Sequence, residues 1–154
     1  MTITTHATVG TLIGYSIGNP VAGFILGIIS HYVLDLIPHG DYKINVDFRK
    51  TKKKIKRAVA YGTVDAVLAI LLILWIVNWK DFANMSAISW AIAGAVLPDL
   101  MVGLYDFTKS KYLKPLNQLH FLFHDHFIKK RGDIPLRYSL AMQAILIVVL
   151  IQFL

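Results

Sequence analysis

The sequence of 154 residues contains no cysteine and no glutamate. Without cysteine the chain has no disulfide and no thiol chemistry. Without glutamate it lacks the His-Glu-x-x-His device of metalloproteases. It also lacks a Gly-x-Ser-x-Gly elbow and a glycine loop that cradles phosphate, so serine or cysteine nucleophilic catalysis has little support.

Charge is scarce as well. Only 16% of the residues are charged and 56% are hydrophobic, whereas about a quarter of a soluble domain is charged. The apolar runs between the charges approach the roughly 20 residues that cross a hydrocarbon core. The sequence therefore predicts an all-α, polytopic integral membrane bundle in one domain, residues 1–154, with about five membrane helices and one interfacial helix. The N-terminal residues lack a basic region and a cleavage site, so we expect them in the mature chain.

The expected membrane helices and the expected interfacial helix follow from these runs. Asn19 and Pro20 separate the first two, as N-cap and first helical residue. Glycines recur every four residues in both, at 10, 14 and 18 and at 23 and 27, which predicts a tight hairpin with close backbone approach. The membrane segments are residues 3–18, 20–37, 56–79, 83–105 and 135–154, and residues 114–128 form the interfacial helix.

The formal net charge of +7 is concentrated in two stretches. Residues 43–57 hold eight of the 16 lysines and arginines, residues 109–137 hold seven, and Lys80 is the exception. This pattern is typical of cytoplasmic loops beside anionic lipid headgroups rather than of a nucleic-acid surface. We expect a cell (inner, cytoplasmic) membrane location, no nucleic-acid partner, a cytoplasmic N-terminus, an outer turn at Lys80 and an external C-terminus.

Several titratable residues are expected at one depth. With Asn19 as the first hairpin tip, one histidine lies 13 residues before it and another 12 after it; with Asp81 as the second tip, aspartates lie 16 before and 18 after. At about 1.5 Å rise per residue these groups are level near the cytoplasmic ends. Titratable groups within spans are costly and usually functional. The level residues are His6, His31, Asp65 and Asp99.

A divalent metal site fits these residue types. His31 and Asp35 share one helix face, and His39 and Asp41 follow just past the helix end, where they could also be plain loop residues. Imidazole and carboxylate are typical ligands of zinc, our first choice, with manganese or magnesium as alternatives. The candidate ligands are His6, His31, Asp35, His39 and Asp99, with Asp41, His120 and His124 as possible additions.

Two features have competing interpretations. Asp65 could be the catalytic base or an orienting residue, or could only hydrogen-bond a neighbouring helix. The histidines at 120, 124 and 126 could supply ligands, since 120 and 124 share a face, but we favour polar positions of an interfacial helix anchored by its phenylalanines. Pro98 is expected to kink its helix and aim Asp99 inward.

Three short motifs carry a family resemblance. Thr5-His6 opens a glycine-rich helix, His-x3-Asp-x2-Pro-His begins at His31, and Gly-x3-Pro-Asp ends at Asp99. Together they resemble the family labelled membrane-bound metal-dependent hydrolases. The resemblance implies a small multi-helix core with His6, His31, Asp35 and Asp99 as candidate ligands. Leu100 follows Asp99 where members of that family often have a second aspartate.

The leading functional prediction is a metal-dependent hydrolase at the cytoplasmic face, acting on a lipid-linked phosphate or a similar anionic amphiphile. A bound zinc-like ion would lower the pKa of a coordinated water, and the basic loops would gather the substrate. One alternative is a transporter or channel with Asp65, Asp99 and the histidines as a cation or proton path. Another is a haem anchor with His6 and His31 as axial ligands. A continuous polar path to Lys80 would favour transport.

Overall fold

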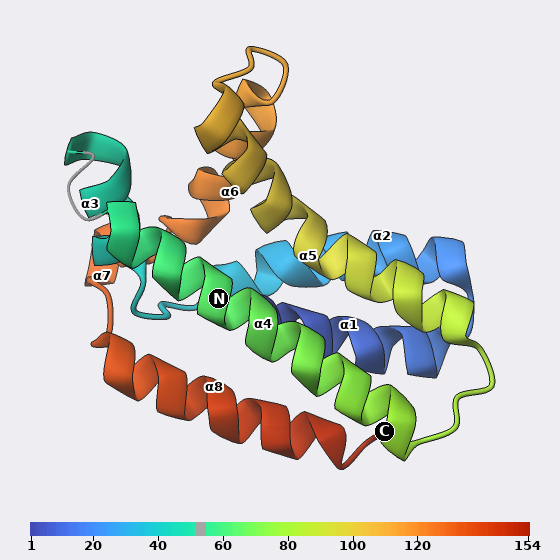
Figure 1. The fold of residues 1–154 in the computed structure, drawn as a ribbon. Coiled ribbons are helices and arrows are strands. Elements are labelled where there is room, and N and C mark those ends of the chain that lie inside the picture. Colours follow the sequence, from blue (N-terminus) through green and yellow to red (C-terminus); the bar gives the residue numbers. More distant parts are fainter. Residues whose placement is uncertain (52–54) are drawn as a thin grey trace.

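The computed structural model describes residues 1–51 and 55–154 (Figure 1). Within these residues the chain forms eight helices and no strand, so the all-α class is confirmed. The basic stretch expected as a loop contains a helix, α3, and Lys52, Lys53 and Lys54 of that stretch lie outside the described residues. The helices are α1 (Ile3–Ile17), α2 (Pro20–Asp35), α3 (Tyr42–Thr51), α4 (Ile55–Trp79), α5 (Met85–Thr108), α6 (Lys114–His124), α7 (Ile128–Arg131) and α8 (Leu136–Ile151).

The predicted boundary between the first two helices is confirmed. Gly18 ends α1 with a left-handed backbone, φ 64°, which costs glycine little. Asn19 then caps α2, because its side-chain oxygen accepts a hydrogen bond from the Ala22 amide at 3.0 Å, and Pro20 is the first helical residue. Local sequence signals therefore set this turn.

The two hairpin tips lie together at one end of the molecule. The Asn84 side chain, which caps α5, also donates to the Gly18 carbonyl at 2.6 Å. The Lys80 ammonium lies 4.6 Å from the centre of the Tyr15 ring. The chain's C-terminus is at the same end (Figure 1). Because the two tips are aligned, titratable residues that lie equally far from them along the helices lie at the same depth.

Small residues bring α1 and α2 against α5. A Cβ added at Gly10 would lie 2.9 Å from the Ile92 Cα, and one at Gly27 would overlap the Ala91 carbonyl oxygen. The glycine stripes thus permit close backbone approach, as expected. Their partner was wrongly assigned, however: the two stripes face α5 rather than each other. The reason is that α5 carries a matching row of small residues, Ala87, Ala91, Gly94 and Ala95.

Among the residues that the structure describes, two helices rather than the five expected have both the length and the composition of a membrane span. These are α4 and α5, in which residues Lys56–Trp79 and Met85–Thr108 qualify. The helices α1, α2 and α8 have 15 or 16 residues, or about 24 Å, which is short of the roughly 30 Å of a hydrocarbon core. Large apolar side chains cover the outer surface of α4: Val59, Val64, Val67, Leu68, Ile70, Leu71, Leu74, Trp75 and Trp79 are exposed.

Helices α4 and α8 meet at one end and part at the other. Ile76 packs with Ile151 and Leu154 near the C-terminus. Toward the other end a mostly apolar groove of about 270 Å³ separates the two helices. Its walls and floor are formed by Thr2, Thr4, Tyr61, Val64, Asp65, Leu68, Leu140, Gln143, Ala144 and Ile147.

Candidate metal centre

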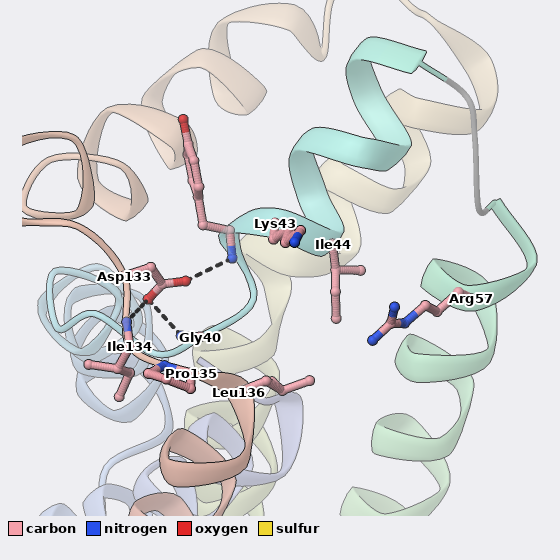
Figure 2. Close-up of a pocket in the computed structure, with 9 residues that line it drawn as sticks. Gly40, Lys43, Ile44, Arg57, Asp133, Ile134, Pro135 and Leu136 are labelled. Carbon is pink, nitrogen blue, oxygen red and sulfur yellow. Dashed lines mark hydrogen bonds between the residues drawn. The ribbon is translucent and has the colours of Figure 1, made fainter.

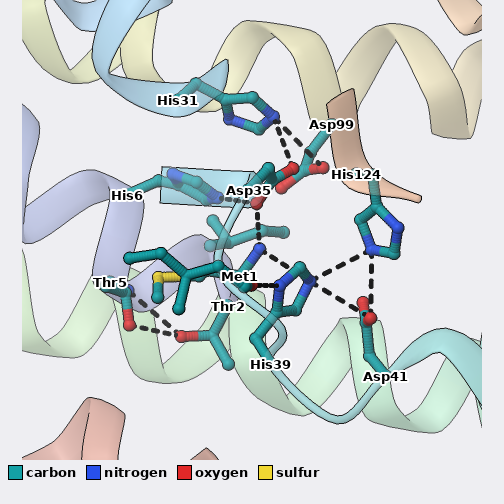
Figure 3. A network of polar contacts seen from close by, with 12 residues as sticks. Met1, Thr2, Thr5, His6, His31, Asp35, His39, Asp41, Asp99 and His124 are labelled. Atoms are coloured by element: carbon teal, nitrogen blue, oxygen red, sulfur yellow. Dashed lines mark hydrogen bonds and ion pairs between the residues drawn. The ribbon is translucent and has the colours of Figure 1, made fainter. Parts of the chain in front are cut away.

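Histidines and aspartates, most of them buried, converge at the end of the bundle opposite the hairpin tips; Figure 3 shows several of them around Met1. They come from α1, α2, α5, α6 and the connection between α2 and α3. Within the described residues they form two groups, in each of which the potential ligand atoms lie within 4.8 Å of one another. The first cluster is His31, Asp35, Asp99 and His120, and the second cluster is His39, Asp41 and His124.

The first cluster has the spacing of a four-ligand cation site. Nε2 of His31 lies 3.2 Å from Oδ2 of Asp35 and 3.8 Å from Oδ1 of Asp99. Nε2 of His120 lies 3.7 and 3.9 Å from the same two oxygens. A tetrahedral zinc ion with bonds of about 2.0–2.2 Å separates its ligands by roughly 3.3–3.6 Å. Oδ2 of Asp35 is buried and accepts no hydrogen bond from the part of the chain that the structure describes, so a cation at this position would satisfy it.

The second cluster is a nearly equilateral triangle. Nε2 of His39 lies 3.0 Å from Nε2 of His124 and 3.1 Å from Oδ1 of Asp41. The third side, from Nε2 of His124 to the same oxygen, is 3.0 Å. These sides approach the separation of adjacent ligands around one ion with bonds of about 2.1 Å.

Hydrogen bonds fix the rings of three cluster histidines. Each uses Nδ1 to contact an oxygen: Ala95 O for His31 at 2.8 Å, Ile37 O for His39 at 2.7 Å, and Oδ1 of Asp125 for His124 at 2.9 Å. Carbonyl and carboxylate oxygens only accept, so the proton is on Nδ1 and, in the neutral ring, the lone pair is on Nε2. Second contacts of this kind orient metal-binding histidines.

The facing nitrogens of the second cluster require a positive charge between them. Two neutral rings that both carry their proton on Nδ1 would oppose lone pairs at the 3.0 Å between His39 and His124. A proton or a cation removes this repulsion. The amino group of Met1 also enters this space, 3.0 Å from Nε2 of His39 and in contact with Oδ1 of Asp35. The carboxylates of Asp35 and Asp41 beside the ring nitrogens favour a positive charge in this space.

The protonation states of the loop and α6 groups agree with this conclusion. Burial raises the pKa of Asp41, but hydrogen bonds from His124 and His39 outweigh it and hold that pKa well below its usual value. Burial lowers the pKa of His124, but bonds to Asp125 and Asp41 raise it to about 9. Burial lowers the pKa of His120 to about 3, against the attraction of Asp35. Asp41 is therefore charged and His120 neutral, the forms that bind metals, whereas His124 carries a proton that a bound cation would have to displace.

His6 lies behind the first cluster rather than within either group. Its Nε2 is 3.1 Å from Oδ1 of Asp35, and its ring stacks on the His31 ring with centroids 4.0 Å apart. Its Nδ1 is buried and has no hydrogen-bond partner. His6, His31 and Asp99 therefore lie at one depth, as expected. His6 contacts Oδ1 of the Asp35 carboxylate and helps to fix its position.

Asp65 contacts the first turn of α1. Its Oδ2 accepts from the Ile3 amide at 2.6 Å, and its Oδ1 accepts from the Thr4 amide at 3.2 Å and the Thr4 hydroxyl at 2.6 Å. A carboxylate at a helix N-terminus satisfies otherwise unpaired amides and favours the helix dipole. Asp65 therefore ties α4 to the start of the helix that carries His6.

Both α6 histidines in the clusters point inward, contrary to the interpretation we favoured. His120 contributes to the first cluster and His124 to the second. His126 lies apart, with Nε2 3.3 Å from the Lys130 ammonium. The four-residue spacing of 120 and 124, the same as in His31 and Asp35, was the available signal. Asp125, which orients His124, had no signal beyond its neighbouring position.

Comparison with known proteins adds no family: no family model, curated protein or solved structure matches the chain. The resemblance to membrane-bound metal-dependent hydrolases thus stays a prediction.

Proposed function

We propose that the chain is a membrane-embedded, metal-dependent hydrolase that binds a zinc-like cation at the first cluster and a second divalent cation at the second cluster. The observation that supports it most is the convergence of oriented histidine nitrogens and carboxylates in one buried space. Nitrogen and oxygen ligands at these spacings suit zinc, with manganese or magnesium as substitutes.

Hydrolysis of a phosphate ester is the reaction that two adjacent cation sites favour. Divalent cations there would supply Lewis-acid chemistry, polarising the scissile group and acidifying water. Among the carboxylates, Asp99 and Asp41 retain 23% and 16% side-chain exposure, whereas Asp35 has 1%. Water and substrate therefore approach on the side of Asp99 and Asp41, and Asp35 and His6 form the closed wall.

The remaining polar residues hold this geometry. Asp125 fixes the His124 ring, and the Ala95 carbonyl fixes His31, one turn before Asp99 on the same helix. Asp65 sets the start of α1 and, through it, the position of His6 against Asp35. We assign Asp65 the role of a positioning residue; of the three interpretations given for it, its contacts match the hydrogen bond to a neighbouring helix.

An amphiphilic substrate is supported by the groove between α4 and α8. Its apolar walls suit an acyl or prenyl tail, and its floor is polar. From that floor Gln143 accepts from the Thr2 amide at 2.9 Å and donates to Ser139, whose hydroxyl contacts the His39 carbonyl. A tail in the groove would place its head group near the second cluster. The concentration of basic residues supports a cytoplasmic orientation of this end.

The two alternatives fit the described residues less well. A transporter needs polar groups along its length, but the buried histidines and aspartates gather at one end. Toward the hairpin tips, the Thr8 and Thr11 hydroxyls bond only to carbonyls of their own helix. A haem held between His6 and His31 needs room for a porphyrin, and their rings stack at 4.0 Å.

The proposal is tested with detergent-solubilised protein, zinc or manganese, and a panel of lipid phosphates and pyrophosphates. We expect release of phosphate by the wild type and by His126→Ala, and none by His31→Ala/Asp35→Ala. If no panel member is cleaved while proteoliposomes carry a cation flux that requires Asp99, the transporter replaces the hydrolase.

A further inference from the structure

A second cavity has Gly40 in its wall (Figure 2). Its volume is about 410 Å³. Because Gly40 stands between His39 and Asp41 in the chain, the cavity wall and the second cluster share one short segment of backbone. The lining residues are Gly40, Tyr42, Lys43, Ile44, Arg57, Asp133, Ile134, Pro135 and Leu136.

The shared segment is held rigidly by Asp133. Its carboxylate accepts from the amides of Gly40 at 2.8 Å, Tyr42 at 3.2 Å and Ile134 at 2.9 Å. Gly40 has φ 82°, and a Cβ there would lie 2.7 Å from the Leu136 Cα, so only glycine fits without a shift of the backbone. The negative charge of Asp133 is therefore compensated by three amides at the cavity wall.

Unlike the Asp133 carboxylate, the two cationic side chains that line the cavity have no partner of opposite charge among the described residues. Lys43 and Arg57 face it from α3 and α4 (Figure 2), and neither forms an ion pair with any residue that the structure describes. The other walls are largely apolar, formed by Ile44, Ile134 and Leu136. Two unpaired cations above apolar walls suit an anionic group attached to an apolar body.

We propose that this cavity binds the phosphate group of an amphiphilic substrate, with Lys43 and Arg57 as its ligands. A guanidinium matches phosphate oxygens with two parallel N–H donors, and a lysine adds a point charge. The inference rests on the proposed function in one respect: binding here presents the phosphate next to the second cluster. Phosphate recognition itself depends only on Lys43, Arg57 and the cavity.

The test measures binding of phenylphosphonate, a soluble phosphate-monoester analogue, and of short-chain phosphatidic acid in micelles, by calorimetry on the full chain as purified. Replacement of either cation, Lys43→Gln or Arg57→Gln, should weaken binding about tenfold, since each removes a charge-assisted hydrogen bond. Lys80→Gln, at the opposite end, is the matched control and should bind as the wild type does. Binding of both probes means that the phosphate suffices; binding of the lipid alone means that the lipid body is also required.

The two proposals fail in different ways. Equal binding by the wild type and by Lys43→Gln/Arg57→Gln, or no binding at all, overturns the phosphate site. Binding that is lost in His31→Ala/Asp35→Ala but kept in both cation variants places the anion on the metal centre, which overturns this inference and leaves the hydrolase standing. If the purified protein contains no metal but binds the probes in a manner that depends on Arg57, the phosphate site stands and the metal-dependent hydrolase is refuted.

Discussion

His120 and His124 lie one helical turn apart on α6, with ring centroids 5.6 Å apart, yet each belongs to a different cluster. A single helix face thus bridges the two candidate sites. His120 Nε2 faces Asp35 and Asp99, whereas His124 Nε2 faces Asp41 and His39. The two clusters should therefore be separable by substitutions on one helix.

Replacing either histidine by alanine should lower the bound metal by about one ion per chain and leave the other ion in place. The reason is that each ring supplies a ligand to one cluster only. Metal content is measured by elemental analysis of the purified protein. His126→Ala is the matched control, because this histidine belongs to neither cluster and its ring contacts Lys130 and Phe127. Wild-type metal content in both His120→Ala and His124→Ala would refute the assignment.

The sequence predicted part of this centre because helix geometry is regular. The sequence indicated turns at Asn19 and Asp81. Counting residues from these two tips predicted that His31 and Asp99 lie at the same depth. This worked because the tips do lie together, joined by Asn84 and Gly18. His39 and Asp41 were accessible only as neighbours of that motif, since a loop has no fixed rise per residue.

Other features could not be predicted from one chain alone. Phe121 and Phe123 alternate with the histidines in the sequence around α6, so its composition does not say whether the histidines face lipid or protein. A glycine stripe predicts close approach but not the partner, and here α5 competes with the hairpin mate. The α3 helix is rich in lysine and arginine, which also suit a loop. Only tertiary contacts decide these cases.

Gly94→Ala and Gly103→Ala should differ sharply, although both lie on α5. A Cβ at Gly94 would overlap the Phe24 carbonyl oxygen, whereas one at Gly103 meets nothing within 4 Å. Gly94→Ala should push α2 from α5 and destabilise the protein by about 1–3 kcal/mol. Gly103→Ala should be neutral or up to about 1 kcal/mol stabilising, since alanine favours a helix. Thermal unfolding in detergent measures both, and equal midpoints would contradict the close α2–α5 packing.

Membrane orientation can be tested without background, because the chain has no cysteine of its own. If the metal centre faces the cytoplasm, Tyr112→Cys should resist an impermeant thiol reagent in intact cells, and Asp81→Cys should react. Tyr112 is 79% exposed, so protection there would reflect the membrane rather than burial in the fold. Labelling after permeabilisation is the control for both sites. The reverse pattern would place the centre outside.

Asp65→Asn separates a positioning residue from a catalytic base. In the wild type, the donors of Ile3 and Thr4 bind the two oxygens of the Asp65 carboxylate. Asparagine keeps one of these oxygens and places an NH₂ group, itself a donor, where the other was. We expect a loss of stability of about 1–3 kcal/mol, unchanged metal content and at most about a tenfold fall in kcat. The pH profile of kcat/KM should keep its shape, because no titrating group of the reaction is removed.

Thr4→Val provides the matched control for that experiment. It removes the hydroxyl that donates to Asp65 at 2.6 Å and leaves the carboxylate in place. If Asp65 acts by holding the start of α1, Thr4→Val should reproduce part of the loss of both stability and rate, since the same contact is weakened from the other side. A catalytic base would behave differently, because Asp65→Asn would then cost about 10²–10⁴-fold in rate and flatten one limb of the pH profile, while Thr4→Val retained nearly full activity. That outcome would make Asp65 the catalytic base. It would also require a conformation in which its carboxylate no longer binds the amides of α1.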